Sequence, residues 1–381
     1  MARDATKGGP PKIYITAEDD EFDEETLREW RAEGFDVEYI PMNGGGKPYR
    51  DRMHSLTDSR KLGEMYAIVG KVDSFCSHIK PFPKLVALVA YYPTAIPDPK
   101  TRFTPSLQVC VHLADGQGEI GVCRNPEILG IQGKRKTVRK RITPGKGIGG
   151  TGVTDYPSYV YDNVDPGFAE HDLEEYNKVA ARVAFTRSLT AVRKGFKSEV
   201  ELEPILEDNI EKKYRARDPS KILSTMTSIP HVSHIPTLTG GVGREDLEDF
   251  YTNFFLPPPP SLTTRLLSRT IGVDRIVDEL YVTFKHDVQI DWILPGIPPT
   301  GKYVEIAMVI IVAVKGGKLE SEHVYWDQAS VLVQVGLLDP KVVPGNMKIK
   351  GVKRLPAAGR EGARLALNEE SVTMNELIPD W

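Results

Sequence analysis

Residues 84–92 read Lys-Leu-Val-Ala-Leu-Val-Ala-Tyr-Tyr, and every residue after the lysine is apolar or aromatic. A strand with one face in water alternates apolar and polar residues, whereas a strand covered on both faces is apolar throughout. This stretch therefore predicts a central strand of a parallel sheet, with helices on both sides of that sheet.

The sequence around this strand repeats the pattern of βα units. Short runs of β-branched and apolar residues predict strands at 12–16, 36–40, 65–70, 85–92, 107–113 and 159–162. Amphipathic stretches with acids first and bases last predict helices at 23–33 and 170–196, and Gly34 ends the first of them. We expect one α/β domain with a mostly parallel sheet over residues 10–197.

A second pattern follows, since 381 residues correspond to two domains of ordinary size. Residues 198–228 are charged and predict a linker or bridging helix. Residues 229–345 predict an α+β domain, and residues 346–381 a tail with little structure beyond a short pattern at 364–367. Within the second domain, helices are expected at 246–254 and from Ser261, and strands at 280–286, 304–314 and 322–327, with Gly316-Gly317 as a turn.

Charge and hydropathy exclude several functional classes. The 49 basic and 53 acidic residues give a net charge of −4, so neither nucleic acid nor an anionic membrane is an expected partner. The longest apolar run, 306–314, has nine residues, whereas a membrane-spanning helix needs about 20. The first residues lack the apolar stretch of a secretory signal, and a cytoplasmic location is expected.

Metal and cofactor sites are not expected. Cys76, Cys110 and Cys123 have no CxxC spacing and predict reduced thiols. His231 and His234 lie between prolines without an acidic residue at ligand spacing. Six basic residues in 134–141 predict a solvated loop or strand edge, and the glycines of 144–152 do not have the spacing of a phosphate-binding loop.

In hydrolases with this kind of α/β domain, the nucleophile lies on a sharp turn after a central strand. The turn after the predicted strand 65–70 reads Gly70-Lys-Val-Asp-Ser74. Val72 stands where the nucleophile is expected, and Ser74 and Cys76 are out of register with it. The sequence therefore predicts a domain without its nucleophile.

Residues 12–197 nevertheless resemble the dienelactone hydrolase family of the α/β-hydrolase fold. The resemblance lies in Leu-Val-Ala-Leu-Val-Ala-Tyr-Tyr-Pro from residue 85, Val-Cys-Val-His-Leu-Ala from 109 and Gly-Phe-Ala-Glu-His-Asp from 167. It implies an α/β-hydrolase-like fold. Pro166 precedes Gly167-Phe168 where the family has its catalytic histidine, and His171 lies five residues further on. An inactive scaffold is expected, with a lactone or ester hydrolase as the alternative.

Two groups of polar residues interrupt the apolar strands of the second domain: His286-Asp287 with Asp291-Trp292, and Glu-His-Val-Tyr-Trp-Asp at 322–327. Ionisable groups on such a surface are unfavourable unless they are paired or line a cavity. On a strand, His323, Tyr325 and Asp327 share one face, and Glu322, Val324 and Trp326 share the other. We predict that the first face lines a pocket, the alternative being a buried, hydrogen-bonded pair with a structural role.

The second domain resembles the SnoaL family of polyketide cyclases, over about residues 230–340. The resemblance lies in Thr-Phe-Lys-His-Asp from 283, Leu-Pro-Gly-Ile-Pro-Pro-Thr-Gly-Lys from 294, Gly317-Lys318 and Asp-Gln-Ala-Ser-Val-Leu-Val-Gln-Val-Gly from 327. It implies an NTF2-like cone around a pocket, with cofactor-free acid–base ring closure. The expected catalytic residues are Asp327, His286 and His323, and the expected substrate-binding residues are Arg269, Tyr281, Asp287, Trp292, Tyr325 and Trp326.

The sequence thus predicts an α/β-hydrolase-like domain followed by a SnoaL-like α+β domain. We expect the latter to bind a hydrophobic oxygenated metabolite, polyketide- or terpenoid-like, and to cyclise or isomerise it. The alternatives are the hydrolase and a non-catalytic ligand-binding or assembly protein. Because the strand 304–314 is more apolar than one half-exposed face requires, a homodimer or burial against the first domain is also expected.

Overall fold

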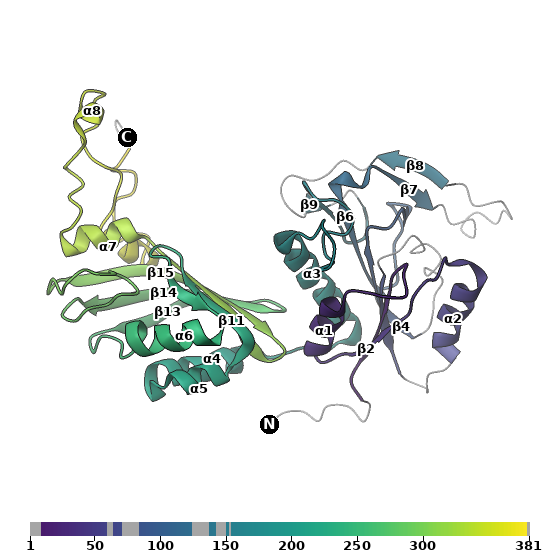
Figure 1. Ribbon diagram of the computed structural model, residues 1–381. Coiled ribbons are helices and arrows are strands. Elements are labelled where there is room, and N and C mark those ends of the chain that lie inside the picture. The colour runs from purple at the N-terminus through teal and green to yellow at the C-terminus, as the bar shows by residue number, and fades with distance from the viewer. Residues whose placement is uncertain are drawn as a thin grey trace. The chain divides into compact units, whose positions relative to one another are not determined.

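The computed structural model describes residues 9–58, 64–70, 84–123, 137–141, 150–151 and 154–378. The chain divides into unit 1, Met1–Val200, and unit 2, Glu201–Trp381. Each unit is built around its own sheet (Figure 1).

Unit 1 contains a seven-stranded sheet in the order β2-β1-β3-β4-β6-β10-β9. All neighbouring strands are parallel except the short β9. The strand β4 is buried at every position, as its uniformly apolar sequence predicts. The sheet strands are β1 (Lys12–Thr16), β2 (Asp36–Tyr39), β3 (Tyr66–Gly70), β4 (Leu85–Tyr91), β6 (Gln108–Ala114), β9 (Gly150–Thr151) and β10 (Ser158–Tyr161); a smaller sheet holds β5 (Ala95–Pro97), β7 (Glu119–Cys123) and β8 (Thr137–Arg141).

Helices cover both faces of this sheet. The helices α1 (Glu24–Ala32) and α3 (Lys178–Phe196) lie on one face, and α2 (Gly46–Asp58) lies on the other (Figure 1). The expected helix 170–196 begins at Lys178 instead, because Asn177 caps it by accepting from the backbone of Val179 and Ala180. The expected α/β class with a parallel sheet is confirmed. The dienelactone hydrolase resemblance stays a prediction, and Val72, Ser74 and Cys76 lie outside the described residues.

Unit 2 contains a six-stranded sheet in the order β12-β11-β16-β15-β14-β13. The helices within residues 203–250 lie against one face of this sheet (Figure 1), and their apolar side chains share one core with it. The strands are β11 (Met226–His234), β12 (Thr239–Val242), β13 (Thr263–Ile271), β14 (Arg275–Lys285), β15 (Tyr303–Lys315) and β16 (Lys318–Trp326); the helices are α4 (Glu203–Glu211), α5 (Pro219–Ser224), α6 (Arg244–Phe250), α7 (Gln328–Val335), α8 (Gly345–Lys348) and α9 (Glu361–Leu367).

Three features of unit 2 differ from the sequence expectations. The range 198–228 contains α4 and α5, whose Leu206 and Ile222 belong to the core of unit 2. No helix begins at Ser261: the β-branched residues that follow it form β13, which pairs with β14. In the tail, α9 lies against β15, where Arg364 donates to the Glu305 carboxylate at 2.8 and 2.9 Å.

An ion pair connects α1 of unit 1 to the segment before α3. Asp23 is the N-cap of α1, and its carboxylate lies 2.8 Å from His171 Nδ1. Burial by itself would raise the pKa of Asp23, but hydrogen bonds from His171 and Thr26 hold it well below its usual 3.8. The hydrogen bond to Asp23 raises the pKa of His171 above its usual 6.5.

We expect this pair to make the stability of α1 dependent on pH. A histidine with a raised pKa stabilises the fold fully below pH 6.5 and loses this effect as the pH rises through its folded-state pKa. Asp23 contributes above pH 3.8 and loses its effect as the pH falls through its lowered pKa. His171→Gln should therefore lower the opening free energy of α1 by about 1 kcal/mol near pH 6 and by less at alkaline pH, as measured by amide hydrogen exchange. A difference that does not change with pH would contradict this role.

Candidate functional site

The buried polar side chains of unit 2 meet inside the helix-covered face of the sheet. Lys213 Nζ lies 2.6 Å from Glu322 Oε2, and the two side chains are only 6% and 9% exposed. Burial by itself would lower the pKa of Lys213, but the adjacent Glu322 carboxylate outweighs burial and raises it. The lysine is therefore a cation in an otherwise apolar core.

Tyr251 and His234 complete this group, which we call the interior cluster (Lys213, His234, Tyr251 and Glu322). The Tyr251 ring centre is 5.8 Å from Lys213 Nζ, and the Lys213 ammonium approaches its hydroxyl, but the hydroxyl donates to no acceptor among the described residues. Burial raises the pKa of Tyr251 to about 12 and lowers that of His234 to about 4, so both side chains are neutral near pH 7.

The backbone that carries two of these residues is irregular. Lys213 lies in the π-helical turn Lys212–Ala216 after α4, and Tyr251 begins the π-helical turn Tyr251–Phe255 after α6. Isolated π-helical turns are rare and occur frequently at functional sites. Both turns directly follow the last residue of an α-helix, and each supplies a polar side chain to the same interior.

Aromatic rings surround His234. The rings of Phe250, Phe255, Trp292 and Trp326 have their centres 5.3–6.2 Å from the imidazole centre. His234 Nδ1 lies 3.2 Å from the hydroxyl of Thr239. The interior cluster is thus enclosed by apolar walls, in which electrostatic interactions are stronger than in water.

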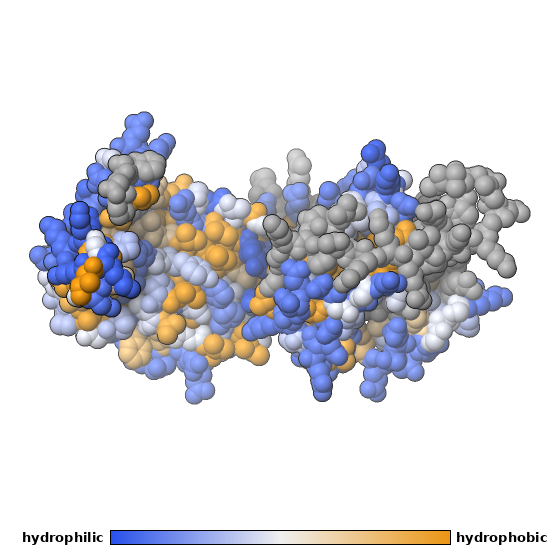
Figure 2. All heavy atoms as spheres, turned by 90° about the horizontal axis from the view of Figure 1, so that it is seen from above, coloured by the Kyte–Doolittle hydropathy of each residue, from blue (hydrophilic) through white to orange (hydrophobic). Residues whose placement is uncertain are grey.

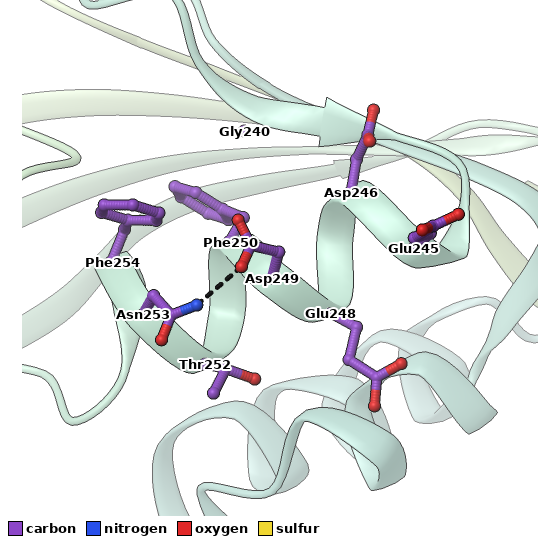
Figure 3. A pocket seen from close by; sticks show the side chains of 9 residues that line it. All are labelled: Gly240, Glu245, Asp246, Glu248, Asp249, Phe250, Thr252, Asn253 and Phe254. Carbon is purple, nitrogen blue, oxygen red and sulfur yellow. Dashed lines mark hydrogen bonds between the residues drawn. The ribbon is translucent and has the colours of Figure 1, made fainter.

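Four hollows in the described part of unit 2 lie away from the interior cluster. The largest of four has a volume of 730 Å³ and lies beside α6, where Glu245, Asp246, Glu248 and Asp249 line it (Figure 3). The other three have volumes of 350–420 Å³. None of the four is lined by a residue of the interior cluster. A ligand would therefore have to displace side chains that now fill the interior.

The expected catalytic residues do not meet in one place. Asp327 caps α7, where its carboxylate accepts from the backbone of Ala329 and the hydroxyl of Ser330. His286 is fully buried at the end of β14, and its Nδ1 lies 3.1 Å from the hydroxyl of Thr300. Burial lowers the pKa of His286.

On β16 the residues alternate as expected, but the other set faces the interior. Glu322, Val324 and Trp326 are buried against the helices, whereas Tyr325 is 38% exposed on the outer face of the sheet. His323 also lies on the outer face, with its Nε2 3.2 Å from His231 Nε2. That His323, Tyr325 and Asp327 line a pocket stays a prediction, because alternation shows which residues share a face and not which face is inward.

The expected substrate-binding residues also lie in different parts of unit 2. Trp292 and Trp326 lie beside His234. The guanidinium of Arg269 pairs with Asp278 and Glu203, and the hydroxyl of Tyr281 donates to Glu305. Asp287 is exposed. Their assigned roles stay predictions.

Apolar side chains also gather on the outer face of the sheet, opposite α4, α5 and α6 (Figures 1 and 2). Val309 and Ile311 of β15 lie there beside Val277 of β14, and all three are half-buried. We expect a second copy of the chain to cover β15, and this stays a prediction.

Unit 1 has a buried polar cluster of its own around His112. The His112 ring is fully buried, and its two nitrogens lie 2.9 Å from Tyr161 Oη and Ser188 Oγ. Cys110 Sγ is 3.4 Å away. Burial lowers the pKa of His112 to about 3 and raises that of Cys110 to about 12, so the imidazole is neutral and the sulfur is a thiol. The cluster is a satisfied hydrogen-bond network within the core, without an activated nucleophile.

The described residues contain neither a membrane-spanning helix nor a cluster of metal ligands. No helix among them is long and apolar enough to cross a membrane. No group of three or more histidine, cysteine, aspartate or glutamate side chains among them is placed to hold a metal ion. The basic residues 134–136 and the glycines of 145–149 and 152 lie outside the described residues.

No family model and no curated protein matches this chain. Among solved structures, it is similar to a putative SnoaL-like polyketide cyclase from Jannaschia sp. CCS1, with 17% identity over 37% of this chain and 98% of that chain and a TM-score of 0.31. It is also similar to AclR, a putative hydroxylase from Streptomyces galilaeus, with 19% identity over 44% of this chain and 96% of that chain and a TM-score of 0.30. A third is SalBIII, an epoxide hydrolase/cyclase-like enzyme in pyran ring formation in polyether salinomycin, with 15% identity over 33% and 90% and a TM-score of 0.26. Similarities of this size assign neither an activity nor a ligand.

The capping role of Asp327 is tested by two substitutions. Asp327→Ala should lower the free energy of unfolding by about 1 kcal/mol, because α7 loses its N-cap acceptor. Asp327→Asn should stay within about 0.3 kcal/mol of the wild type in urea denaturation, because asparagine caps helices equally well. Destabilisation of the same size in both variants would contradict the cap. Since asparagine is not a base, this second variant also isolates any chemical role of the carboxylate.

The buried ion pair is tested by a double-mutant cycle. Lys213→Met alone should destabilise unit 2 by about 3–5 kcal/mol, because the Glu322 carboxylate stays buried without its partner. The double variant with Glu322→Leu should recover most of this loss, since an apolar pair removes the unpaired charge. Additive losses in urea denaturation would show that the two groups do not depend on each other.

Proposed function

We propose that unit 2 binds a hydrophobic, oxygenated small molecule, polyketide- or terpenoid-like, at the interior cluster and catalyses a cofactor-free isomerisation or cyclisation. The observation that supports this most is the convergence of Lys213, Tyr251 and Glu322 inside an apolar core, two of them on π-helical turns. A buried ion pair stabilises a fold no better than apolar side chains of the same size. Stability alone therefore does not explain its presence, and a role in chemistry is consistent with it.

The groups present suffice for proton transfer beside a carbonyl. In the proposed reaction, the Glu322 carboxylate takes a proton from the carbon next to a ligand carbonyl, and the electron pair moves onto the carbonyl oxygen as an enolate. The neutral Tyr251 hydroxyl and the Lys213 ammonium stabilise this oxygen. The unpaired Tyr251 hydroxyl supports this role, because a buried donor without an acceptor is available to a ligand oxygen.

The two reaction outcomes differ only in where the enolate electrons go. In an isomerisation, the proton returns from Glu322 to a different carbon of a conjugated enolate. In a cyclisation, the enolate carbon forms a bond to a second carbonyl carbon of the ligand, and the proton goes to the new alkoxide. Both sequences conserve atoms and electrons without an added oxidant or metal.

The proposal is tested with 2-tetralone, a bicyclic ketone whose C1 protons exchange with solvent through its enol. The wild-type protein should accelerate their exchange in D₂O, followed by proton NMR. Glu322→Gln should reduce the acceleration at least ~100-fold, the range for loss of a general base, and Tyr251→Phe by about 10- to 100-fold. Glu322→Gln and Tyr251→Phe both keep the approximate size and shape of the side chain.

Glu248→Gln is the matched control, because Glu248 is exposed beside the hollow of Figure 3 and should leave the rate unchanged. Circular dichroism shows that each variant is folded. Exchange no faster than in buffer, or equally fast with folded Glu322→Gln, would refute the proposed chemistry. Exchange lost only on substitution of Asp327 or His286 would instead support the residues expected from the sequence.

A further inference from the structure

The indole of Trp292 fills a slot beside the interior cluster. Its ring centre lies 5.3 Å from the His234 imidazole and 5.3 Å from the Phe255 ring, at 38° to each. The Trp326 ring closes the slot at 6.2 Å, almost perpendicular to the indole. The slot therefore has the shape of a flat, fused ring pair, with aromatic walls that favour offset or edge contacts.

The backbone that carries Trp292 is firmly held. Its carbonyl oxygen accepts from Thr237 Oγ1 at 2.9 Å, and the carbonyl of the next residue, Ile293, accepts from Gln328 Nε2 at 2.9 Å. Ile293 and Leu294 are almost fully buried in the core of unit 2. Movement of this whole segment would expose these apolar side chains to water, so the segment stays in place.

The indole itself is less constrained than its backbone. Trp326 donates from its indole nitrogen to Gln328 Oε1 at 2.6 Å. The Trp292 indole makes no such hydrogen bond to a described residue, and Trp292 is 4% exposed. Rotation about its side-chain bonds breaks aromatic contacts but no hydrogen bond. Of the two tryptophans of the slot, only Trp326 is held by a hydrogen bond from its indole nitrogen to a described residue.

The slot and the interior cluster share a wall. The Phe255 ring that packs on Trp292 has its centre 6.0 Å from Lys213 Nζ. A ring held in place of the indole would contact the same Phe255 ring that lies beside Lys213. No other approach to the cluster is opened by a hollow among the four described.

We propose that Trp292 is the specificity-determining residue of this site: its indole occupies the ring subsite when no ligand is present, and a planar ligand ring of similar size displaces it. This proposal rests on the proposed function for the position of the chemistry, but not for the binding itself. The ligands selected are flat fused-ring compounds, because a puckered ring of the same carbon framework is too thick for a slot shaped by an indole.

The test compares 2-naphthol with decahydro-2-naphthol, which has the same framework but puckered rings, by isothermal titration calorimetry. Trp292→Ala should bind 2-naphthol at least tenfold more tightly than the wild type, because the ligand no longer has to displace the indole. The gain for decahydro-2-naphthol should be less than threefold. Leu238→Ala is the control, since Leu238 is 93% exposed on the turn before β12 and should change neither affinity.

A second measurement uses the wild-type chain labelled with 5-fluorotryptophan, so that the proposal stays testable if Trp292→Ala does not fold. Saturation with 2-naphthol should move the fluorine resonance of Trp292, assigned with Trp292→Phe, toward its solvent-exposed position, and the Trp326 resonance much less. An unmoved Trp292 resonance, an equal gain for both probes in Trp292→Ala, or no binding of 2-naphthol to either protein would overturn the proposal. If 2-naphthol binds as expected, in Glu322→Gln as well as in the wild type, but the wild-type protein does not accelerate the 2-tetralone exchange, the proposed reaction is refuted and the ring subsite is retained.

Discussion

The contact between the Lys213 ammonium and the Glu322 carboxylate, 2.6 Å apart, is the constraint on which the interior of unit 2 depends. Neither charge is tolerated in an apolar core without the other. The pair therefore requires that β16 presents Glu322 inward and that the chain after α4 turns Lys213 toward the sheet. A register slip of one residue in β16 would bury His323 and expose Glu322, and it would leave Lys213 without its partner.

Buried polar groups occur in both units, and their hydrogen bonding separates two kinds of role. The ring nitrogens of His112 in unit 1 both have partners within the core, and such satisfied networks hold a fold in one arrangement. In unit 2, the Tyr251 hydroxyl is buried beside a lysine cation and donates to no acceptor among the described residues. A donor left unpaired in the folded state is unfavourable by itself and becomes favourable when a ligand oxygen accepts from it.

Much of the fold follows from the sequence, because the spacing of apolar residues in a strand depends directly on burial. The uniformly apolar residues of β4 and the alternation along β16 are both observed. The site was harder to predict for two reasons. Alternation identifies the two faces of β16 without showing that Glu322 points inward. Lys213 lies in the charged sequence Glu211-Lys-Lys-Tyr, where a π-helical turn, and not a regular helix period, decides which lysine is buried.

The position of Asp327 is explained by its role as the N-cap of α7, and the sequence carries the signal for this role. An aspartate directly before an apolar helix is a strong N-cap signal, and its carboxylate accepts from the backbone of α7. The sequence does not predict a metal ligand at His234, because no acidic residue lies at ligand spacing; Pro230 lies in the irregular stretch of β11 between Met226 and His231, where a strand tolerates proline. The place of His234 inside the aromatic walls follows from the pairing of β11 with β16, which no local pattern reveals.

A crystal structure of the full chain with bound 2-naphthol, a planar analogue of an enolate, tests the role of the interior cluster most directly. If the cluster is the functional centre, the naphthol ring will lie against Phe255 in place of the Trp292 indole. Its oxygen will then lie within hydrogen-bond distance of Tyr251 Oη or Lys213 Nζ. Naphthol density only at other places, such as the acidic hollow beside α6, with the Trp292 indole still packed on Phe255, would contradict a functional centre in the interior of unit 2.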